Sequence, residues 1–597
     1  MPHATAPTPA DTATIHYRVH LHDLHAHLYR VVLTIAQPAA HQEVRLPVWI
    51  PGSYLVREFA KNLHQLQAQQ NGQPCQVEQR NKNSWRLHCV AGQPLQLEYL
   101  VSAYDPSVRM AWLDQRRGFF NGTSLLLRVL GQEAQAHTLD IVAPEQPAQQ
   151  DWQLATGLTP CAVDARGFGC YQAAHYDELV DAPVEMGHFW SASFDACGVP
   201  HRLVVTGAPA SFDGARLLAN TQKICAAQIR LWHPDGTPPP QRSYVFLLHA
   251  THNGYGGLEH HNSTALICAR SDLPRQGTST QPEGYTTLLG LISHEYFHTW
   301  NVKRLRPAQF VPYDYDQENY TELLWFFEGL TSYYDDLILQ RAGLIDSATY
   351  LKLLGKTLNQ VRQTPGRHVQ SVAQASFDAW VKYYRQDENT ANATVSYYTK
   401  GALVGLCLDL ALRQAGSSLD ALMRTLWQRC AGGALREADI LAALHELTGR
   451  SWAADLQAWV HGTHDLPVAE LLAPFGVRLE PTDATPAQRL GLRVQEGSSI
   501  QVQQVLRGSV AEQAGFMAGD EWYGIEVDGC GWRIASLDDL ALHTGQRPQT
   551  TALVARDRQL LRLALTLPAP DSVQLVQLRT SDHPQLASWL VQAPASV

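Results

Sequence analysis

The chain has 597 residues, which is too many for a single hydrophobic core, so several domains are expected. Its 45% hydrophobic and 17% charged residues are typical of a folded globular protein. The net charge of -10 argues against nucleic acid or an anionic membrane as the main partner, and no apolar run approaches the roughly 20 residues needed to cross a bilayer.

Residues 1–14 are rich in Ala, Thr and Pro and lack the basic start and apolar stretch of a secretion signal. They predict a disordered N-terminus and a cytoplasmic protein, although removal of a leader would allow a periplasmic one. The ten cysteines have no paired short spacing, which favours neither a zinc ribbon nor a disulfide framework.

The next two regions differ in their periodicity. Residues 15–186 contain short runs that alternate between apolar and polar, separated by turn residues, and this pattern predicts a β-sandwich-type domain. Residues 187–473 begin with strands at 202–206 and 244–249. Helical periodicity follows at residues 285–303, 320–342, 403–414 and 440–447. We expect an α+β domain whose second half is mostly helical.

The pattern changes again at residues 478–568, to short strands with one helix. The run from Ala514-Gly515 to Gly519-Asp520 resembles the core of a PDZ domain, with residues 536–543 as the helix beside its peptide groove. The Leu490-Gly491-Leu492 loop either receives the carboxylate of a protein C-terminus, or the domain packs on its neighbour and shapes access to it. Residues 569–597 are interpreted as a C-terminal tail.

Residues 293–298 read Ser-His-Glu-Tyr-Phe-His and contain the pattern H-E-x-x-H. On an α-helix, residues four apart lie on one face, so His294 and His298 can reach one metal ion. Glu295 is placed to take a proton from a zinc-activated water rather than to bind the metal. The apolar residues before the motif favour a buried metal-bearing helix over the alternative of two structural histidines. We therefore predict one Zn2+ ion and zinc-dependent hydrolysis.

A catalytic zinc needs a third protein ligand. Glu328 lies within the strongly apolar segment 324–334, where a lone carboxylate is costly unless a cation or hydrogen-bond donors compensate it. Glu322 and Asp335 are the competing carboxylates. Because Asp335 lies seven residues from Glu328, on the same helical face, it is better suited to hold a ligand histidine. We predict Glu328 as the third ligand.

With this ligand set the sequence resembles the gluzincin peptidases, and more closely the glycyl aminopeptidase family. The resemblance rests on residues 294–307 (HEYFHTWNVKRLRP), on the Trp-Phe-x-Glu-Gly block at 325–329 and on the appended PDZ domain. It implies an α+β multidomain fold with a β-sandwich-like N-terminal domain, a thermolysin-like, mostly helical catalytic domain and a C-terminal PDZ domain. Residues 51–54 (Pro-Gly-Ser-Tyr) also resemble a family segment, but the resemblance gives them no role.

Two further segments take their meaning from this resemblance. Residues 256–260 look like the Gly-x-Met-Glu-Asn segment of related aminopeptidases, with His260 in place of Asn. The resemblance implies that Gly256, Gly257 and Glu259 bind substrate, with Glu259 holding the free α-ammonium group. Residues 396–402 resemble the Tyr-x-Lys-Gly segment, which makes Tyr398 the donor to the tetrahedral oxyanion and Tyr397 its runner-up.

Three basic residues, Lys303, Arg304 and Arg306, follow the metal-bearing helix. They either bind a substrate carboxylate or cap the C-terminal end of the helix against its dipole. The aromatic residues 325–327 are interpreted as core.

These observations predict a zinc aminopeptidase that removes the N-terminal residue from peptides. The family resemblance implies glycine or alanine as that residue. The alternatives are a PDZ-guided endopeptidase, a dipeptide-releasing enzyme and a non-catalytic peptide-binding scaffold. A scaffold would have no need of the complete set His294, Glu295, His298 and Glu328. Peptides are the expected partners, with protein C-termini at the PDZ domain and no nucleic acid or membrane.

Overall fold

The computed structural model describes residues 14–569, 573–580 and 583–590. The predicted disordered N-terminus, apart from Thr14, therefore lies outside the described residues. The described chain divides into two compact units: residues 14–319 with 430–435, and residues 320–429 with 436–590. Within the described residues, no helix is both long and apolar enough to cross a membrane.

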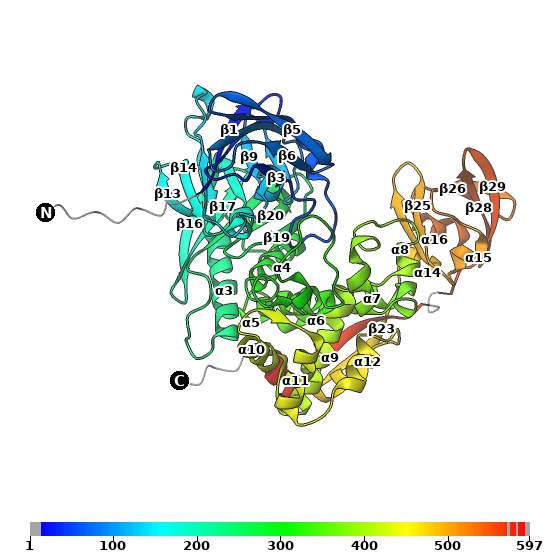
Figure 1. Ribbon diagram of the computed structural model, residues 1–597. Helices are drawn as coiled ribbons and strands as arrows, with labels where there is room; N and C mark the ends of the chain where they lie inside the picture. The colour runs from blue at the N-terminus through cyan, green and yellow to red at the C-terminus, as the bar shows by residue number, and fades with distance from the viewer. Residues whose placement is uncertain (1–13, 570–572, 581–582, 591–597) are drawn as a thin grey trace. The chain divides into compact units, whose positions relative to one another are not determined.

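The first unit begins with a β-rich domain (blue to cyan in Figure 1). Its eleven-stranded sheet has the order β10-β3-β6-β5-β4-β7-β2-β1-β11-β14-β13, and a second sheet has the order β12-β15-β9-β8. Alternate residues of β1, such as Tyr17 and Val19, are buried in the core, as period-two patterning predicts. The elements are β1 (Ile15–Asp23), β2 (Leu28–Ile35), β3 (His41–Arg45), η2 (Phe59–Asn62), β4 (Leu63–Gln70), β5 (Gln73–Asn81), β6 (Ser84–His88), β7 (Leu95–Ser102), β8 (Ala111–Leu113), β9 (Arg117–Phe120), α1 (Gly122–Leu125), β10 (Arg128–Val129), β11 (His137–Ile141), β12 (Gln153–Thr156), β13 (Thr159–Val163), β14 (Gly169–Ala173), α2 (Tyr176–Val180) and β15 (Val184–Gly187).

The same unit continues with a five-stranded sheet and two long helices that lie beside it (Figure 1). The strand order is β16-β17-β18-β20-β19, so β19 is an edge strand. Gln228 of α3 donates hydrogen bonds to the Ser293 carbonyl (2.7 Å) and hydroxyl (3.1 Å), which fixes α4 against α3. The elements are β16 (Phe189–Ala196), β17 (Val199–Thr206), α3 (Gly214–Trp232), β18 (Tyr244–Thr251), β19 (Gly256–Glu259), β20 (Ser263–Ala269) and α4 (Glu283–Phe297).

Helix α4 is shorter than predicted. The sequence pattern predicts a helix through residue 303, but α4 ends at Phe297 and turns follow. The chain reverses direction there because Val302 adopts a φ of 119° and its N–H bonds to the Leu305 carbonyl. The apolar residues Trp300 and Val302 are buried by this reversal rather than by a helical face, which explains why periodicity alone was wrong.

The second unit is mostly helical. The helix predicted from residue 320 begins only at residue 324 and contains a π-helical turn, η6 (Trp325–Gly329), before α5 (Leu330–Arg341). The predicted helical stretches 403–414 and 440–447 are confirmed within α9 and α11. The remaining helices are α6 (Ser347–Arg362), α7 (Val372–Phe377), α8 (Thr390–Ala393), α9 (Thr399–Gln414), α10 (Leu419–Arg429), α11 (Glu437–Thr448), α12 (Ala453–Trp459) and α13 (Val468–Leu472).

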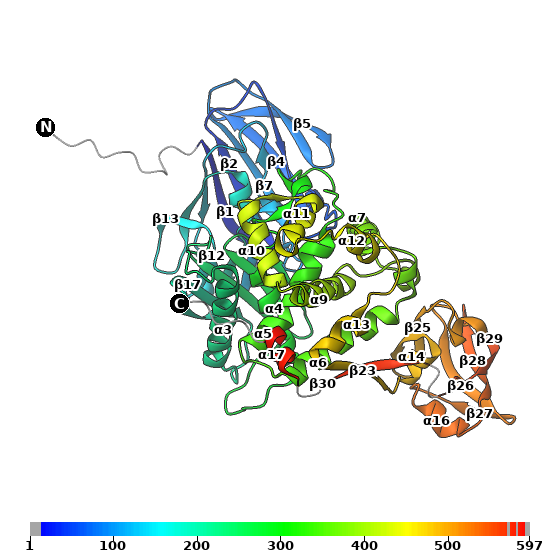
Figure 2. The ribbon, with the colours of Figure 1, turned by 90° about the horizontal axis from the view of Figure 1, so that it is seen from below.

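A separate small β domain is inserted in the sequence between two strands of this unit that pair with each other. Strands β23 (Val477–Thr482) and β30 (Leu575–Thr580) pair antiparallel (Figure 2). Asn359 of α6 bonds to both backbone groups of Val576. The segment predicted as a tail thus contains β30 and helix α17 (Pro584–Leu590). The inserted domain has its own core. It comprises α14 (Pro486–Leu490), β24 (Leu492–Glu496), β25 (Ile500–Val505), α15 (Val510–Ala514), β26 (Glu521–Val527), β27 (Cys530–Arg533), α16 (Asp539–Thr544), β28 (Gln549–Arg556) and β29 (Gln559–Thr566).

Candidate active site

The two motif histidines lie at the C-terminal end of α4, with ring centroids 4.7 Å apart. His298 is buried, and its Nδ1 lies 2.8 Å from the Asn301 carbonyl oxygen. Because a carbonyl only accepts hydrogen bonds, Nδ1 donates this bond, which leaves Nε2 as the ring nitrogen for a metal ion. Metal-binding histidines commonly donate their other ring N–H to a backbone carbonyl in this way, which fixes the orientation of the ring. The early end of α4 produces it, since the chain reversal brings Asn301 back to the ring.

Glu295 of α4 lies against the edge strand β19. The side chain is 5% exposed, and a Cβ atom on Gly257 would lie 2.1 Å from its Oε1. No side chain therefore fits at residue 257 while Glu295 stays in place. The glycine that the family resemblance assigns to substrate binding has a local structural reason as well, because it lets the strand backbone approach the carboxylate.

Glu259, at the end of β19, joins this group. Donor atoms of Glu259, Glu295 and His298 all lie within 4.8 Å of one another. Glu259 is 4% exposed, and no residue in the described part of the chain makes a hydrogen bond to its Oε1. A buried carboxylate oxygen without a partner is costly unless a cation meets it. The arrangement is therefore suited to a cationic ligand, either a metal ion or a substrate ammonium group.

Beside Glu259 lies a charge cluster that the sequence did not predict. Asp181 accepts hydrogen bonds from Lys303 Nζ (2.7 Å) and from the backbone N–H of His261 (2.8 Å), and it lies 3.1 Å from His260 Nδ1. Burial alone would raise the pKa of Asp181, but Lys303 and the two histidines hold that pKa well below its usual value. The His260 that replaces the family's Asn is thus an Asp181 partner. Nothing local in the sequence marks Asp181, which follows α2 in the N-terminal domain.

Two of the three basic residues after α4, Lys303 and Arg304, have partners other than those predicted. Lys303 is 1% exposed and bound to Asp181, so it is not available to a substrate carboxylate. Arg304 donates through Nη1 to the carbonyls of Thr299 (2.7 Å) and His261 (3.0 Å). Arg304 thus holds the turn that follows the helix and does not cap the helix itself.

In the second unit, Glu328 lies in the π-helical turn η6 and is 2% exposed, whereas its competitor Glu322 is exposed. Single π-turns occur often at functional sites. A Cβ atom on Gly329 would lie 2.5 Å from Gly401 Cα, so only glycine allows η6 and α9 to approach this closely. The two motif glycines therefore bring the N-terminal end of α9 against the turn that carries Glu328.

The two tyrosines at the start of α9 differ in exposure. Tyr397 is fully buried, whereas Tyr398 is half-buried and its hydroxyl lies 3.3 Å from that of Tyr384. Their rings are 4.7 Å apart. Of the two residues, Tyr398 is therefore the more exposed.

Comparison with known proteins places this arrangement in a family. A model described as M61 glycyl aminopeptidase matches residues 287–404, and one described as the peptidase M61 N-terminal domain matches residues 16–188. A crystal structure described as an aminopeptidase N family protein from Idiomarina loihiensis is 38% identical, with a TM-score of 0.91, over 97% of this chain and 100% of that chain. The chain belongs to the M61 peptidase family. The predicted enzyme class, a zinc metallopeptidase of the aminopeptidase kind, is confirmed, as are the β-rich N-terminal domain and the α+β organisation.

More distant structures are also similar to this M61 peptidase. An M1 zinc metallopeptidase from Deinococcus radiodurans is 13% identical with a TM-score of 0.46, over 76% of this chain and 97% of that chain. A mutant of it bound to a Tyr-Ser-Ala substrate is 14% identical with a TM-score of 0.48, over 76% and 95%. None of the curated proteins compared matches the chain.

Proposed function

We propose that this M61 peptidase removes an N-terminal glycine or alanine from peptides, using one zinc ion held by His294, His298 and Glu328. The observation that carries the proposal is the buried Glu259 carboxylate beside Glu295 and His298. Its unpartnered oxygen fits the α-ammonium group of a substrate. Two histidine nitrogens and one carboxylate are a donor set typical of catalytic zinc.

The chain's own residues then have distinct roles. When bound, zinc supplies the Lewis acidity that polarises the scissile carbonyl and lowers the pKa of a water to about 7. Glu295 accepts a proton from the attacking water and returns it to the leaving amine. Tyr398 donates its hydroxyl to the developing oxyanion. Glu259 holds the substrate's amino terminus, so that only the first peptide bond reaches Glu295.

The first test compares the wild type with Glu295→Gln on glycyl, alanyl and leucyl aryl-amides. The substitution keeps the side chain's size but removes the proton acceptor, so kcat should fall by about 100-fold to 10,000-fold. A Glu283→Gln variant, at the other end of α4, serves as the control and should keep wild-type activity. Full activity of Glu295→Gln would rule out its role as the base.

An endopeptidase or a dipeptide-releasing enzyme is the alternative within the same class. N-acetylation of a test peptide separates the two readings because it removes the charge that Glu259 would bind. Cleavage should stop for an aminopeptidase. Continued cleavage, or release of a dipeptide as the first product, would favour the alternative. Membership of the M61 peptidases speaks against the non-catalytic scaffold.

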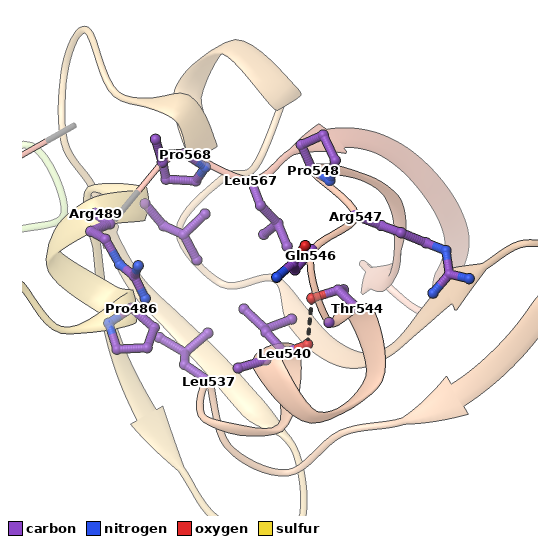
Figure 3. Close-up of a pocket in the computed structure, with 14 residues that line it drawn as sticks. Pro486, Arg489, Leu537, Leu540, Thr544, Gln546, Arg547, Pro548, Leu567 and Pro568 are labelled. Atoms are coloured by element: carbon purple, nitrogen blue, oxygen red, sulfur yellow. Dashed lines mark hydrogen bonds between the residues drawn. The ribbon is translucent and has the colours of Figure 1, made fainter. Parts of the chain in front are cut away.

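We further propose that the inserted C-terminal domain is a PDZ domain that binds protein C-termini. A cavity of about 560 Å³ lies between α14 and α16, lined by Arg489 and by apolar side chains such as Leu540 (Figure 3). Strand β24 is at an edge of its sheet, where an extended peptide can add as a further strand. The domain also contacts the helical part of its own unit, since Asn392 donates to the Val505 carbonyl, so a role in shaping access stays open.

A fluorescent peptide with a hydrophobic C-terminal residue tests this second proposal. It should bind with a free carboxylate and lose most of its affinity when amidated. Ala541→Asp places a carboxylate at the exposed edge of the cavity and should weaken binding without changing aryl-amide hydrolysis. Equal affinity for the free and amidated peptides would contradict carboxylate recognition. The cytoplasmic location remains a prediction.

A further inference from the structure

The N-terminal β domain reaches the group around Glu259 through the Pro-Gly-Ser-Tyr segment, residues 51–54. Gly52 has a φ of 91°, and a Cβ atom there would lie 2.4 Å from Glu259 Oε1 and 2.6 Å from both Cδ and Oε2. The Gly52 backbone therefore lies directly against the carboxylate. Glycine is required for two independent reasons, because the left-handed backbone disfavours a side chain and the carboxylate occupies the space.

Local contacts hold this segment in place. Ser53 is fully buried and its N–H donates to the Ile50 carbonyl (3.0 Å). Arg57 Nη2 donates to the Ser53 hydroxyl (2.8 Å), and the Arg57 N–H donates to the Val48 carbonyl (2.7 Å). A segment bonded in this way presents Gly52 as a fixed surface to the carboxylate.

A second residue of the N-terminal domain fixes the strand that carries Glu259. Arg109 Nη2 donates to the Gly257 carbonyl at 3.1 Å. Because β19 is an edge strand, this bond supplies a partner to its outer side that no neighbouring strand provides. Arg109 thus holds the strand two residues before the carboxylate against which Gly52 packs.

We propose that the N-terminal β domain helps to form the site that binds the amino terminus of the substrate. Gly52 positions the Glu259 carboxylate, and Arg109 positions strand β19. The inference rests on the proposed function, because it takes Glu259 as the group that binds the substrate's ammonium. It gives residues 51–54 a role: they set where the amino terminus of the peptide is held relative to Glu295.

Gly52→Ala tests the inference against a matched control, Gly72→Ala. Gly72 lies in the same domain with a φ of 74° and has nothing within 4 Å of an added Cβ atom. Both substitutions strain a left-handed backbone, but only the first meets Glu259. For glycyl aryl-amide, Gly52→Ala should raise KM at least tenfold, whereas Gly72→Ala should leave KM and kcat at wild-type values.

A double-mutant cycle with Glu259→Asp separates positioning from a general structural defect. Aspartate is shorter by one methylene group and leaves room for the added methyl group. The loss of kcat/KM in Gly52→Ala/Glu259→Asp should therefore be at least fivefold smaller than the product of the two single losses. Losses that simply multiply would overturn the inference, as would a Gly52→Ala variant with the wild-type KM.

If Gly52→Ala does not fold, variants of Arg109 test the same inference. Arg109→Met removes the hydrogen bond to Gly257 and should raise KM several-fold, and Arg109→Lys should restore part of the loss. An unchanged KM in Arg109→Met would count against the inference. Failure of the proposed function gives a different pattern: wild-type protein would release nothing from aryl-amides, or Glu259→Gln would be as active as wild type.

Discussion

At the scale of single residues, the buried Asp181–Lys303 pair makes folding stability depend on pH. The side chains are 11% and 1% exposed. Burial lowers the pKa of Lys303, but Asp181 outweighs this and raises the pKa above its usual 10.5. The pKa of Asp181 is held well below its usual 3.8. Because both charged forms favour the native state, the pair's contribution is fully present between these two values.

Asp181→Asn should therefore reduce the free energy of unfolding by about 3–5 kcal/mol near neutral pH, because it leaves Lys303 buried without its partner. As the pH falls below 3.8, the unfolded state protonates first, and the wild type loses this contribution as the pH approaches the native pKa. Denaturant unfolding at several pH values measures the difference. Asp140→Asn, in the exposed pair with Arg18, should cost less than about 1 kcal/mol, and an equal cost would contradict the role of burial.

The proposed metal ligands give a second prediction at this scale. His298→Ala and Glu328→Ala should each lower the zinc retained after dialysis at least tenfold, since a three-ligand site loses a donor. Glu322→Ala should keep the zinc content of wild type, because Glu322 is an exposed carboxylate. Metal analysis of the purified variants is the measurement. Zinc loss in Glu322→Ala with retention in Glu328→Ala would reassign the third ligand.

At the scale of elements, the positions of His298 and Glu328 depend on where a helix ends or changes its winding. Helix α4 ends directly before His298, and that end creates the hydrogen bond from His298 to Asn301. Glu328 lies where an α-helix widens to a π-turn. Sequence periodicity identifies the helix in both cases but misses the local feature that orients the side chain.

The close approach of η6 and α9 is testable by helical Gly→Ala substitutions. In Gly329→Ala, the added methyl group meets the Gly401 backbone, which cannot move away as a side chain can, so stability should fall by about 1–3 kcal/mol. Gly355→Ala in α6 is the matched control. Its Cβ atom makes only ordinary contacts at 3.8 Å and beyond, so helix propensity should stabilise the protein by up to about 1 kcal/mol. Thermal unfolding distinguishes the two signs.

At the scale of the whole chain, the helical part of the second unit is built from residues that precede the inserted domain in the sequence and residues that follow it. Strand β30 returns to pair with β23, and Trp589 of α17 is fully buried and donates to the Tyr333 hydroxyl at 2.9 Å. Residues 573–580 and 583–590 therefore complete the helical unit, whereas residues 484–569 form a domain with its own core.

Two deletions should consequently behave in opposite ways. Replacing residues 484–569 by a short glycine linker should leave folding and aryl-amide hydrolysis largely intact, because Thr482 and Leu575 are paired neighbours. Deleting residues from 573 onward should destabilise the helical unit by several kcal/mol, since loss of one buried tryptophan side chain alone costs about 3–5 kcal/mol. Circular dichroism melting and activity assays check both. A stable, active chain that ends at residue 572 would contradict this division.

The sequence by itself determined the β-rich first domain, the helical second half, the metal-binding motif and the enzyme class. These features depend on spacing within one or two turns of a helix or a few residues of a strand, which the order of residues encodes directly. Glu328 stays a prediction of a different kind, which rests on the cost of a lone carboxylate within an apolar helix.

Only the tertiary structure decided which distant residues share the site. Asp181 and Lys303 are 122 residues apart, and Gly52 and Glu259 belong to different domains. Neither pair leaves a local pattern, because their contacts depend on the path of the backbone between them. The chain reversal after α4 and the pairing of β30 with β23 likewise leave no local pattern in the sequence. Long-range packing, rather than the propensity of the residues involved, fixed each of them.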